Sequence, residues 1–239
     1  MKGKYVLISL DDGTVQDEKV IGILKKYGLK ATFNINTGLL GKREELPIIT
    51  EYGVCLRHDI ITSKQLINDL YADFEVACHT LTHAKLNDLN NREIKKEIFK
   101  NFDDIKSMTG VSPVGIAYPG MTPNYNRTVK DILKNDGRIL YGRTIDESGD
   151  FSFPADFYEW NPTVQVRNGN FLNLTQQFLN EKNDDCGRLL FVWGHSYEFD
   201  LSPKLWENFE SFCKMISCND NVKSMTCAEF CKQLKLKNE

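Results

Sequence analysis

The segment EVACHTLTH, residues 75–83, places His79 and His83 four residues apart, directly after a short apolar run. Histidines at this spacing share one face of a helical turn, so both imidazoles can reach a single ion. Asp11 and Asp12 follow another apolar run, and neighbouring residues of an extended segment point to opposite sides. One aspartate and two histidines make three ligands, the number that a catalytic metal site uses when it leaves one position for water.

Each half of this pattern has a simpler interpretation. Two histidines at this spacing can be solvated residues of a surface helix, and the "DDG" of residues 11–13 can be a turn in which an aspartate caps the next helix. If both simpler interpretations held, the two patterns would have arisen by chance at the ends of two separate buried strands. The pattern therefore favours a metal site.

The elements that must position these residues alternate along the chain. Short β-rich runs predict strands at 5–10, 31–35, 75–78, 115–118 and 189–193, and helical patterns cover 18–26, 92–108, 123–135, 203–216 and 227–235. Asn90 with Glu93, and Thr226 with Glu229, have the spacing of capping boxes. Thr122 is the expected N-cap of helix 123–135, with Pro123 in its first turn. Strands that alternate with helices predict a parallel sheet.

Polar residues follow four of these strands, at the point where each strand ends. They are "DDG" after 5–10, "HTLTH" after 75–78, "PG" after 115–118 and "GHSYE" after 189–193. In a β/α barrel the loops after the strands share one face, which carries the active site. We therefore expect an α/β barrel in which residues 1–239 form a single domain.

Composition excludes several classes of function. The 239 residues are 41% hydrophobic and 26% charged, as in ordinary globular proteins, and the net charge of -3 leaves no basic stripe for nucleic acid. The longest apolar runs are too short to span a membrane. The start of the chain shows no leader, which favours a cytoplasmic location, with a secreted form that has lost its signal as the alternative. Seven cysteines without a CxxC pair favour free thiols, and pairing among the last four is the minority interpretation.

Four motifs resemble those of a known family. "SLDDG" (9–13), "HTLTH" (79–83), "AYPG" (117–120) and "WGHS" (193–196) are similar, in this order, to the motifs of polysaccharide deacetylases, the NodB-homology group of carbohydrate esterase family four. The resemblance implies an irregular, deformed TIM-like (β/α) barrel of about seven strands. It also implies a hydrolase that removes acetyl groups from an N- or O-acetylated saccharide.

The resemblance assigns roles to the residues that match its motifs. It implies Asp12, His79 and His83 as ligands of one divalent ion, Asp11 as the general base and His195 as the general acid. Water activated by the ion would be the nucleophile. Zinc is the default for two histidines and one aspartate, although such a site also accepts other first-row ions.

One motif departs from the family pattern. Ala117 stands where an arginine usually braces the catalytic base. We expect Arg143, in "YGRTI" (141–145) near the end of a further expected strand, to replace it. Without a cation nearby the pKa of Asp11 would be higher. The alternative is that Arg143 is an ordinary surface cation.

Other residues are expected to line the substrate pocket. The resemblance implies the backbone amide of Gly120 as an oxyanion donor, beside Tyr118, and Trp160 as a wall of the acetyl pocket. Trp193, also expected at the pocket, stands where the family usually has a leucine, and aromatic residues line sugar sites and cores alike. His58 matches no motif and lies in an irregular polar stretch, so it is expected to be solvated.

Two other functions compete with a deacetylase. One is an amidohydrolase of the same fold that acts on a small nitrogenous compound, for which some relatives lack the metal. The other is a non-catalytic carbohydrate-binding relative. An intact Asp, His, His set argues against the first, and the presence of Asp11 and His195 argues against the second.

Overall fold

A parallel sheet forms the centre of the protein in this computed structural model, which describes residues 2–61, 70–182 and 187–235. Its strands have the order β7-β6-β5-β2-β1-β9-β8, and β10 also pairs with β1. Their bounds are Lys4–Asp12 for β1, Thr32–Ile35 for β2, Glu75–Cys78 for β5, Gly115–Ala117 for β6, Tyr141–Arg143 for β7, Val164–Gln165 for β8, Arg188–His195 for β9 and Val222–Ser224 for β10.

The sheet curls until its two edges meet. Trp160 forms a bridge with Arg143 of β7, and Val164 of β8 pairs with Val192 of β9. The segment 160–165 therefore links the two ends of the sheet. The irregular α/β barrel of about seven strands expected from the sequence is confirmed.

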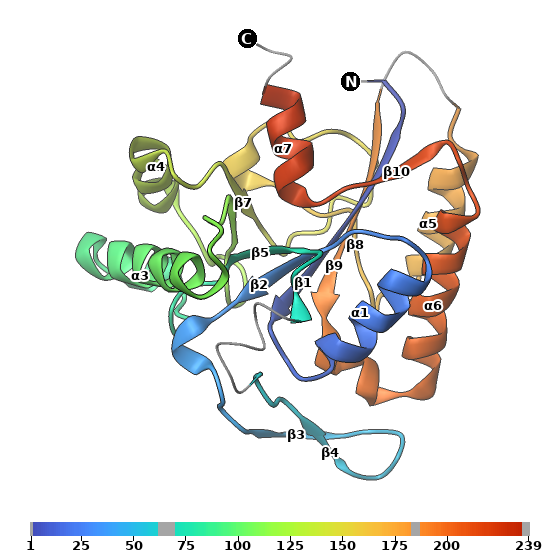
Figure 1. Ribbon diagram of the computed structural model, residues 1–239, viewed down its shortest axis with the longest axis horizontal. Coiled ribbons are helices and arrows are strands. Elements are labelled where there is room, and N and C mark those ends of the chain that lie inside the picture. Colours follow the sequence, from blue (N-terminus) through green and yellow to red (C-terminus); the bar gives the residue numbers. More distant parts are fainter. Residues whose placement is uncertain (1, 62–69, 183–186, 236–239) are drawn as a thin grey trace.

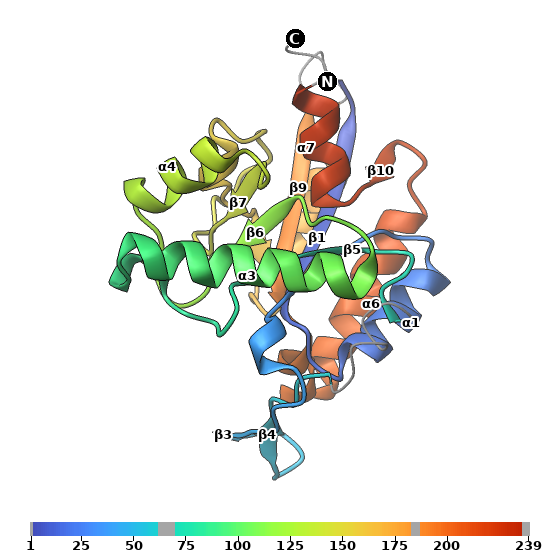
Figure 2. The ribbon, with the colours of Figure 1, turned by 60° about the vertical axis from the view of Figure 1, so that its left-hand side comes forward.

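Helices cover the sheet in two groups (Figures 1 and 2). Helices α1, Asp17–Lys26, α5, Phe171–Asn180, and α6, Pro203–Ser217, pack on one side, and α3, Asn91–Thr109, and α4, Arg127–Asp136, lie on the other. The last helix, α7, Cys227–Lys235, covers the end where the strands begin. The capping boxes of α3 and α7 form as predicted.

The side chains of β1 alternate between the helices outside the barrel and the barrel interior. Val6, Ile8 and Leu10 pack toward α1 and α6, whereas Tyr5 and Leu7 belong to a second cluster with aromatic residues of β7, β9 and α7. Because the side chains of a strand alternate, the inward face continues through Ser9 to Asp11. The first aspartate of "DDG" is thereby directed into the barrel at its carboxyl end.

The helix predicted at 123–135 begins later than expected. It starts at Arg127, with Asn126 as its N-cap, and Thr122 and Pro123 lie in the preceding loop. The Asn126 side chain accepts a hydrogen bond from the backbone N–H of Val129 (3.0 Å). Asn124 donates to the carbonyls of Tyr118 and Gly120, which stabilises the loop instead of a first helical turn. The prediction was wrong because the better capping residue stands four positions farther on.

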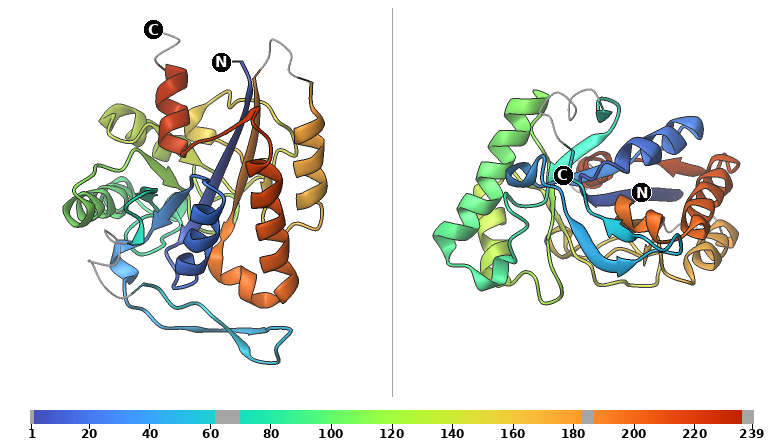
Figure 3. Two further views of the ribbon diagram at one scale, coloured as in Figure 1. Left: turned by 45° about the vertical axis from the view of Figure 1, so that its right-hand side comes forward. Right: turned by 90° about the horizontal axis from the view of Figure 1, so that it is seen from below.

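A β-hairpin was not predicted in the polar region after β2. Strands β3, Glu45–Ile49, and β4, Cys55–Arg57, pair antiparallel and project beyond the carboxyl ends of the barrel strands (Figures 1 and 3). Four of the five residues of β3 are exposed, so no buried alternating face marks it in the sequence. Helix α5 and the short strands β8 and β10 were also missed.

The expectations about membrane-spanning segments and about cysteines can be compared with the described residues. Within them, no helix has the length and apolar character to cross a membrane. Six cysteines, at positions 55, 78, 213, 218, 227 and 231, are free, and Cys186 lies outside the described residues.

Candidate metal centre and active site

Asp12, His79 and His83 meet at the carboxyl end of the barrel. The Oδ1 atom of Asp12 lies 3.4 Å from Nε2 of His79 and 3.6 Å from Nε2 of His83. Within the described part of the chain, these three form the one group of histidine, cysteine or acidic residues whose ligand atoms are close enough to share an ion. Asp12 has a φ of +77°, a conformation uncommon outside glycine, which turns its carboxylate away from the inward face of β1.

Asp12 and His83 are in the ionisation states that metal binding needs. Burial raises the pKa of Asp12, but contacts with His58 and His79 and the charge of His195 lower it well below its usual range. Burial and the neighbouring His79 lower the pKa of His83 to about 4, so its imidazole is neutral at pH 7. His79 donates from Nδ1 to the carbonyl of Ala117 (2.9 Å), and this contact orients the ring so that Nε2 faces Asp12.

The contacts of these atoms test whether a metal ion fits. Asp12 Oδ1 and His79 Nε2 are buried and accept or donate no hydrogen bond among the described residues. Bonds of about 2.0–2.1 Å around a tetrahedral zinc ion separate two ligand atoms by roughly 3.3 Å. The measured 3.4 and 3.6 Å agree with that spacing. A divalent ion therefore fits this group, and would satisfy both buried atoms.

The two histidines do not lie on a helical turn, as the sequence pattern predicted. Residues 79–83 form an irregular loop in which Thr80 and His83 both have positive φ values, 63° and 60°. Asn36 donates to the carbonyls of His79 and Thr80, and Gly38 donates to that of Leu81 (2.8 Å). These contacts hold the loop in a shape that brings the imidazoles together without helical hydrogen bonds.

Asp11 is surrounded by donors inside the barrel. Its Oδ1 accepts hydrogen bonds from Asn34 Nδ2 (2.9 Å) and from a terminal nitrogen of Arg143, which is fully buried. Burial raises the pKa of Asp11, but the Arg143 charge, followed by His79 and His195, lowers it below its usual value. The interpretation of Arg143 as a surface cation was wrong; its role in bracing a base stays a prediction.

His195 ends β9 and faces two carboxylates. Its Nδ1 lies 3.2 Å from Glu198 Oε2, and its Nε2 lies 3.9 Å from the remaining oxygen of Asp11, Oδ2. Burial lowers the pKa of His195, but Glu198, and then Asp12 and Asp11, raise it to about 9. Glu198 was not identified from the sequence, although its position three residues after His195 on a strand end was a usable signal.

His58 was predicted to be solvated, and the structure contradicts this. It follows β4, its side chain is 16% exposed, and its Nε2 lies 3.0 Å from Asp12 Oδ2. Its ring contacts Tyr197 edge to face, with centroids 4.6 Å apart. All four histidines of the chain thus lie around the two aspartates.

A cavity of about 340 Å³ opens over this group. It is lined by Asp12, His58, His83, His195 and Tyr197, together with Leu39, Lys42, Glu44, Leu46 and Thr82. The barrel supplies the reactive side chains, whereas the segment from Leu39 to the hairpin supplies one wall. The cavity is therefore formed jointly by the barrel and by this segment outside it.

Two of the predicted pocket residues lie in the core instead. Tyr118 is fully buried, stacks on Tyr125 and donates to the carbonyl of Tyr158, so its side chain packs behind the sheet. Trp160 is 1% exposed and packs among aromatic residues of the barrel interior, including Phe230 of α7. Both predictions of a pocket wall were wrong, because aromatic side chains near strand ends fill cores as readily as they line sites.

Gly120 and Trp193 have other surroundings. Gly120 has a φ of +83°, and a Cβ added there would approach the Lys85 side chain at 3.6 Å; its assignment as an oxyanion donor stays a prediction. The Trp193 ring lies 5.0 Å from the Arg143 guanidinium and 5.8 Å from the His195 ring. It therefore borders Arg143 and His195, although it does not line the cavity.

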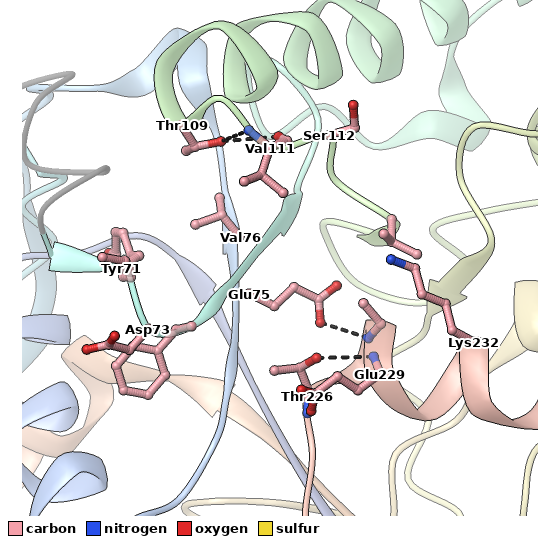
Figure 4. A pocket seen from close by; sticks show the side chains of 14 residues that line it. Tyr71, Asp73, Glu75, Val76, Thr109, Val111, Ser112, Thr226, Glu229 and Lys232 are labelled. Atoms are coloured by element: carbon pink, nitrogen blue, oxygen red, sulfur yellow. Dashed lines mark hydrogen bonds between the residues drawn. The ribbon is translucent and has the colours of Figure 1, made fainter.

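A second cavity, of about 360 Å³, lies at the opposite end of the barrel beside the start of β5 and α7 (Figure 4). Its carboxylate, that of the half-buried Glu75, accepts hydrogen bonds from Tyr141, Thr32 and the backbone N–H of Ala228. Since these contacts occupy both oxygens, the carboxylate stabilises the start of α7 and is not available to a ligand. We take the first cavity as the functional site.

Comparisons with known proteins identify a matching family model and similar folds. A family model described as polysaccharide deacetylase matches residues 1–139. No curated protein matches the chain. The matched part contains Asp11, Asp12, His79 and His83, whereas Arg143 and His195 lie beyond it.

Several solved structures share the fold. A protein from Mycobacterium smegmatis assigned to the polysaccharide deacetylases is 15% identical; the alignment covers 99% of this chain and 92% of that one, with a TM-score of 0.67. A variant of a peptidoglycan deacetylase from Bacillus subtilis is 14% identical, with 99% and 93% covered and a TM-score of 0.56. A family-four pseudoenzyme from Bacillus anthracis is 17% identical, with 96% and 66% covered and a TM-score of 0.58. At these identities the likeness shows the fold alone.

Proposed function

Because this chain belongs to the polysaccharide deacetylase family, we propose that it hydrolyses acetyl groups from an N- or O-acetylated saccharide with the help of one divalent ion. One observation carries the proposal. The buried atoms Asp12 Oδ1 and His79 Nε2 have no hydrogen-bond partner among the described residues, and both face His83 Nε2 beside Asp11 and His195. Buried polar atoms without partners are costly, and a bound cation offsets that cost.

Asp12, His79 and His83 would hold the ion. When bound, it supplies a Lewis acid that polarises the acetyl carbonyl and lowers the pKa of water. Two imidazoles and a carboxylate suit zinc, and this donor set also accepts other first-row ions. The cavity above the group supplies the space in which an acetylated sugar would approach.

Asp11 is proposed as the general base. Arg143 and Asn34 occupy its Oδ1, which fixes the plane of the carboxylate and keeps it ionised. Its Oδ2, facing His195, is then the oxygen that would take a proton from water. Arg143, from β7, supplies the charge that the family pattern provides at the position of Ala117.

His195 is proposed as the general acid. With its pKa raised to about 9, the imidazole is protonated at neutral pH and can donate to the departing amine or alkoxide. Glu198 Oε2 lies 3.2 Å from Nδ1, an ion-pair distance, whereas Nε2 faces Asp11 and is the atom that would donate the proton. The acid and the base would therefore face the same reacting group.

The experiment combines metal analysis with an acetate-release assay. Wild-type protein, His79→Ala and Asp11→Asn are loaded with zinc, dialysed and assayed on N-acetylglucosamine oligomers and O-acetylated xylo-oligosaccharides. We expect about one ion per chain in the wild type, loss of the ion in His79→Ala, and retention of the ion in Asp11→Asn. Asp11→Asn should lose turnover by about 10²–10⁴-fold, the usual contribution of a general base.

Asp73→Asn is the matched control, because Asp73 is an exposed carboxylate paired with Lys25 and remote from the site. It should change neither the ion content nor the turnover. A wild type that binds the ion and releases no acetate from any substrate would favour the non-catalytic function. A wild type that releases acetate without an ion would contradict the role of Asp12, His79 and His83.

A further inference from the structure

We infer that His58 is a positioning residue that holds the Asp12 carboxylate in the orientation needed to bind the ion, an inference that rests on the proposed function. His58 belongs to none of the motifs that suggested the site. It reaches Asp12 from the segment that follows the β3–β4 hairpin, which lies outside the barrel.

The backbone places His58 beside Asp12 by a series of hydrogen bonds. On one side, the N–H of His58 donates to the carbonyl of Glu44 (2.8 Å). On the other, the N–H of Ile61 donates to the carbonyl of Gly13 (3.1 Å), and that of Val15 donates to the carbonyl of Asp59 (2.9 Å). Residues 58–61 are thus fixed directly to the loop that leaves Asp12. The short distance between the two side chains follows from this backbone pairing.

The side chain of His58 is oriented as well as placed. A carboxylate oxygen can only accept, so the 3.0 Å contact with Asp12 Oδ2 requires Nε2 of His58 to carry the proton. The ring is held edge to face against Tyr197. Its other nitrogen, Nδ1, lies 3.9 Å from Glu44 Oε2, too far for a hydrogen bond.

The two oxygens of Asp12 have separate partners. Oδ2 is occupied by His58, and Oδ1 faces His79 and His83. Rotation of the carboxylate would exchange the oxygens or offer both to the ion, and the hydrogen bond to Oδ2 opposes that rotation. Groups that orient metal ligands in this way typically change metal affinity by about 10–100-fold when they are removed.

The same geometry argues that His58 acts through Asp12 and is not a ligand itself. Its Nε2 approaches the oxygen that faces away from His79 and His83, and it is not a member of the group whose ligand atoms can share an ion. Asp12 needs such support, because it is the last residue of β1 and its positive φ turns its side chain out of the regular packing of that strand.

Three substitutions of His58 test the inference through ion affinity. The amide nitrogen of glutamine is as many bonds from Cβ as Nε2 of histidine, whereas that of asparagine corresponds to Nδ1. We expect His58→Gln to bind zinc within a few-fold of wild type. His58→Asn and His58→Ala should both bind about 10–100-fold more weakly, because neither can donate to Oδ2. Zinc affinity is measured by competition with a chromophoric chelator.

Two further measurements separate positioning from a general effect on folding. The melting temperatures of the metal-free variants should be alike, and Tyr52→Ala, at an exposed position of the hairpin turn, should bind zinc as wild type does. A Gln variant that loses zinc as severely as the Ala variant would overturn the inference in favour of direct ligation. A His58→Ala variant with wild-type affinity would overturn it outright.

The same measurements distinguish a failure of the proposed ion site from a failure of the role of His58. Wild-type protein that binds no zinc overturns the proposed ion site, and this inference with it. Wild-type protein that binds zinc while all three variants bind equally well overturns the role of His58 and leaves the ion site intact.

Discussion

Asp11 and Asp12 are neighbours in the sequence but occupy different environments. Asp11 continues the inward face of β1 and meets Arg143 and Asn34, whereas Asp12 adopts a positive φ and faces the histidines. The local backbone therefore gives two identical side chains different partners. This is the physical basis for proposing one as a base and the other as a ligand.

Replacing Glu198 should change the pH range of catalysis. Under the proposed mechanism His195 must be protonated, and its pKa of about 9 means that activity falls as the pH rises through that value. Glu198 is the main influence that opposes the effect of burial, so Glu198→Gln should lower the pKa of His195. We expect the alkaline limb of kcat to move to lower pH while the acid limb stays.

The measurement is a pH profile of kcat for Glu198→Gln and for Glu207→Gln, an exposed carboxylate of α6 that contacts Lys204. The second variant should follow the wild-type profile. If the alkaline limb of Glu198→Gln coincides with that of the wild type, His195 is not the general acid or Glu198 does not control it.

At the residue scale, the sequence predicted the aspartates and three of the four histidines that surround the site. It missed His58, which is half-buried because the β3–β4 hairpin brings it against Asp12. The hairpin strands are short and mostly exposed, so the sequence did not reveal them. The aromatic residues Tyr118 and Trp160 were predicted in the pocket but lie in the core. Their apolar character fits a pocket and a core equally, and only packing distinguishes the two.

At the scale of elements, helix α3 fixes the ends of two strands through one side chain. The fully buried Asn101 accepts from the N–H of His79 (3.1 Å) and donates to the carbonyl of Ile35 and to Thr37 Oγ1 (both 3.0 Å). It thereby connects the end of β2 to the start of loop 79–83, which carries the two proposed histidine ligands. A polar residue on the buried face of an amphipathic helix was the available signal in the sequence.

Asn101→Ala should therefore affect both stability and ion binding. Each buried group left without a partner costs about 1–3 kcal/mol, so the free energy of unfolding should fall by about 2–4 kcal/mol. Zinc affinity should fall as well, because the backbone of His79 loses its support. Asn180→Ala, at an exposed position of α5, should stay within about 0.5 kcal/mol of wild type. An Asn101→Ala protein as stable as that control would contradict this role.

The elements themselves were predictable where the sequence carries an apolar run, a helical period or a cap. Apolar runs identified the strands β1, β2, β5 and β9, and helical periods or caps identified the helices α1, α3, α6 and α7; these predictions are confirmed within a few residues. Strands β8 and β10, of two and three residues, are too short to show a period. Helix α5 is different: its apolar residues at 171, 174 and 178 have helical spacing, so the signal was present and unused.

At the scale of the molecule, β1 joins the two ends of the chain. It pairs with β9 from Lys4 opposite Arg188 to Asp11 opposite His195, and its other edge pairs with both β2 and β10. Asp11 and His195, the proposed base and acid, are thus brought into register by strands far apart in sequence. The part matched by the family model, 1–139, accordingly contains only some of the proposed site.

This connectivity underlies our proposal that residues 1–239 form one domain, and it predicts a single unfolding transition. Ile8 of β1 belongs to the cluster that includes Trp206, and Leu7, its neighbour, belongs to the cluster that includes Trp160. Since one strand supplies both clusters, neither can lose its packing while the other keeps it. Two variants that retain only Trp160 or only Trp206, with the other tryptophans replaced by phenylalanine, report on the clusters separately. Their fluorescence transitions in urea should share one midpoint with the far-ultraviolet circular dichroism of the same variant, and separate midpoints within either variant would mean that the chain folds as more than one unit.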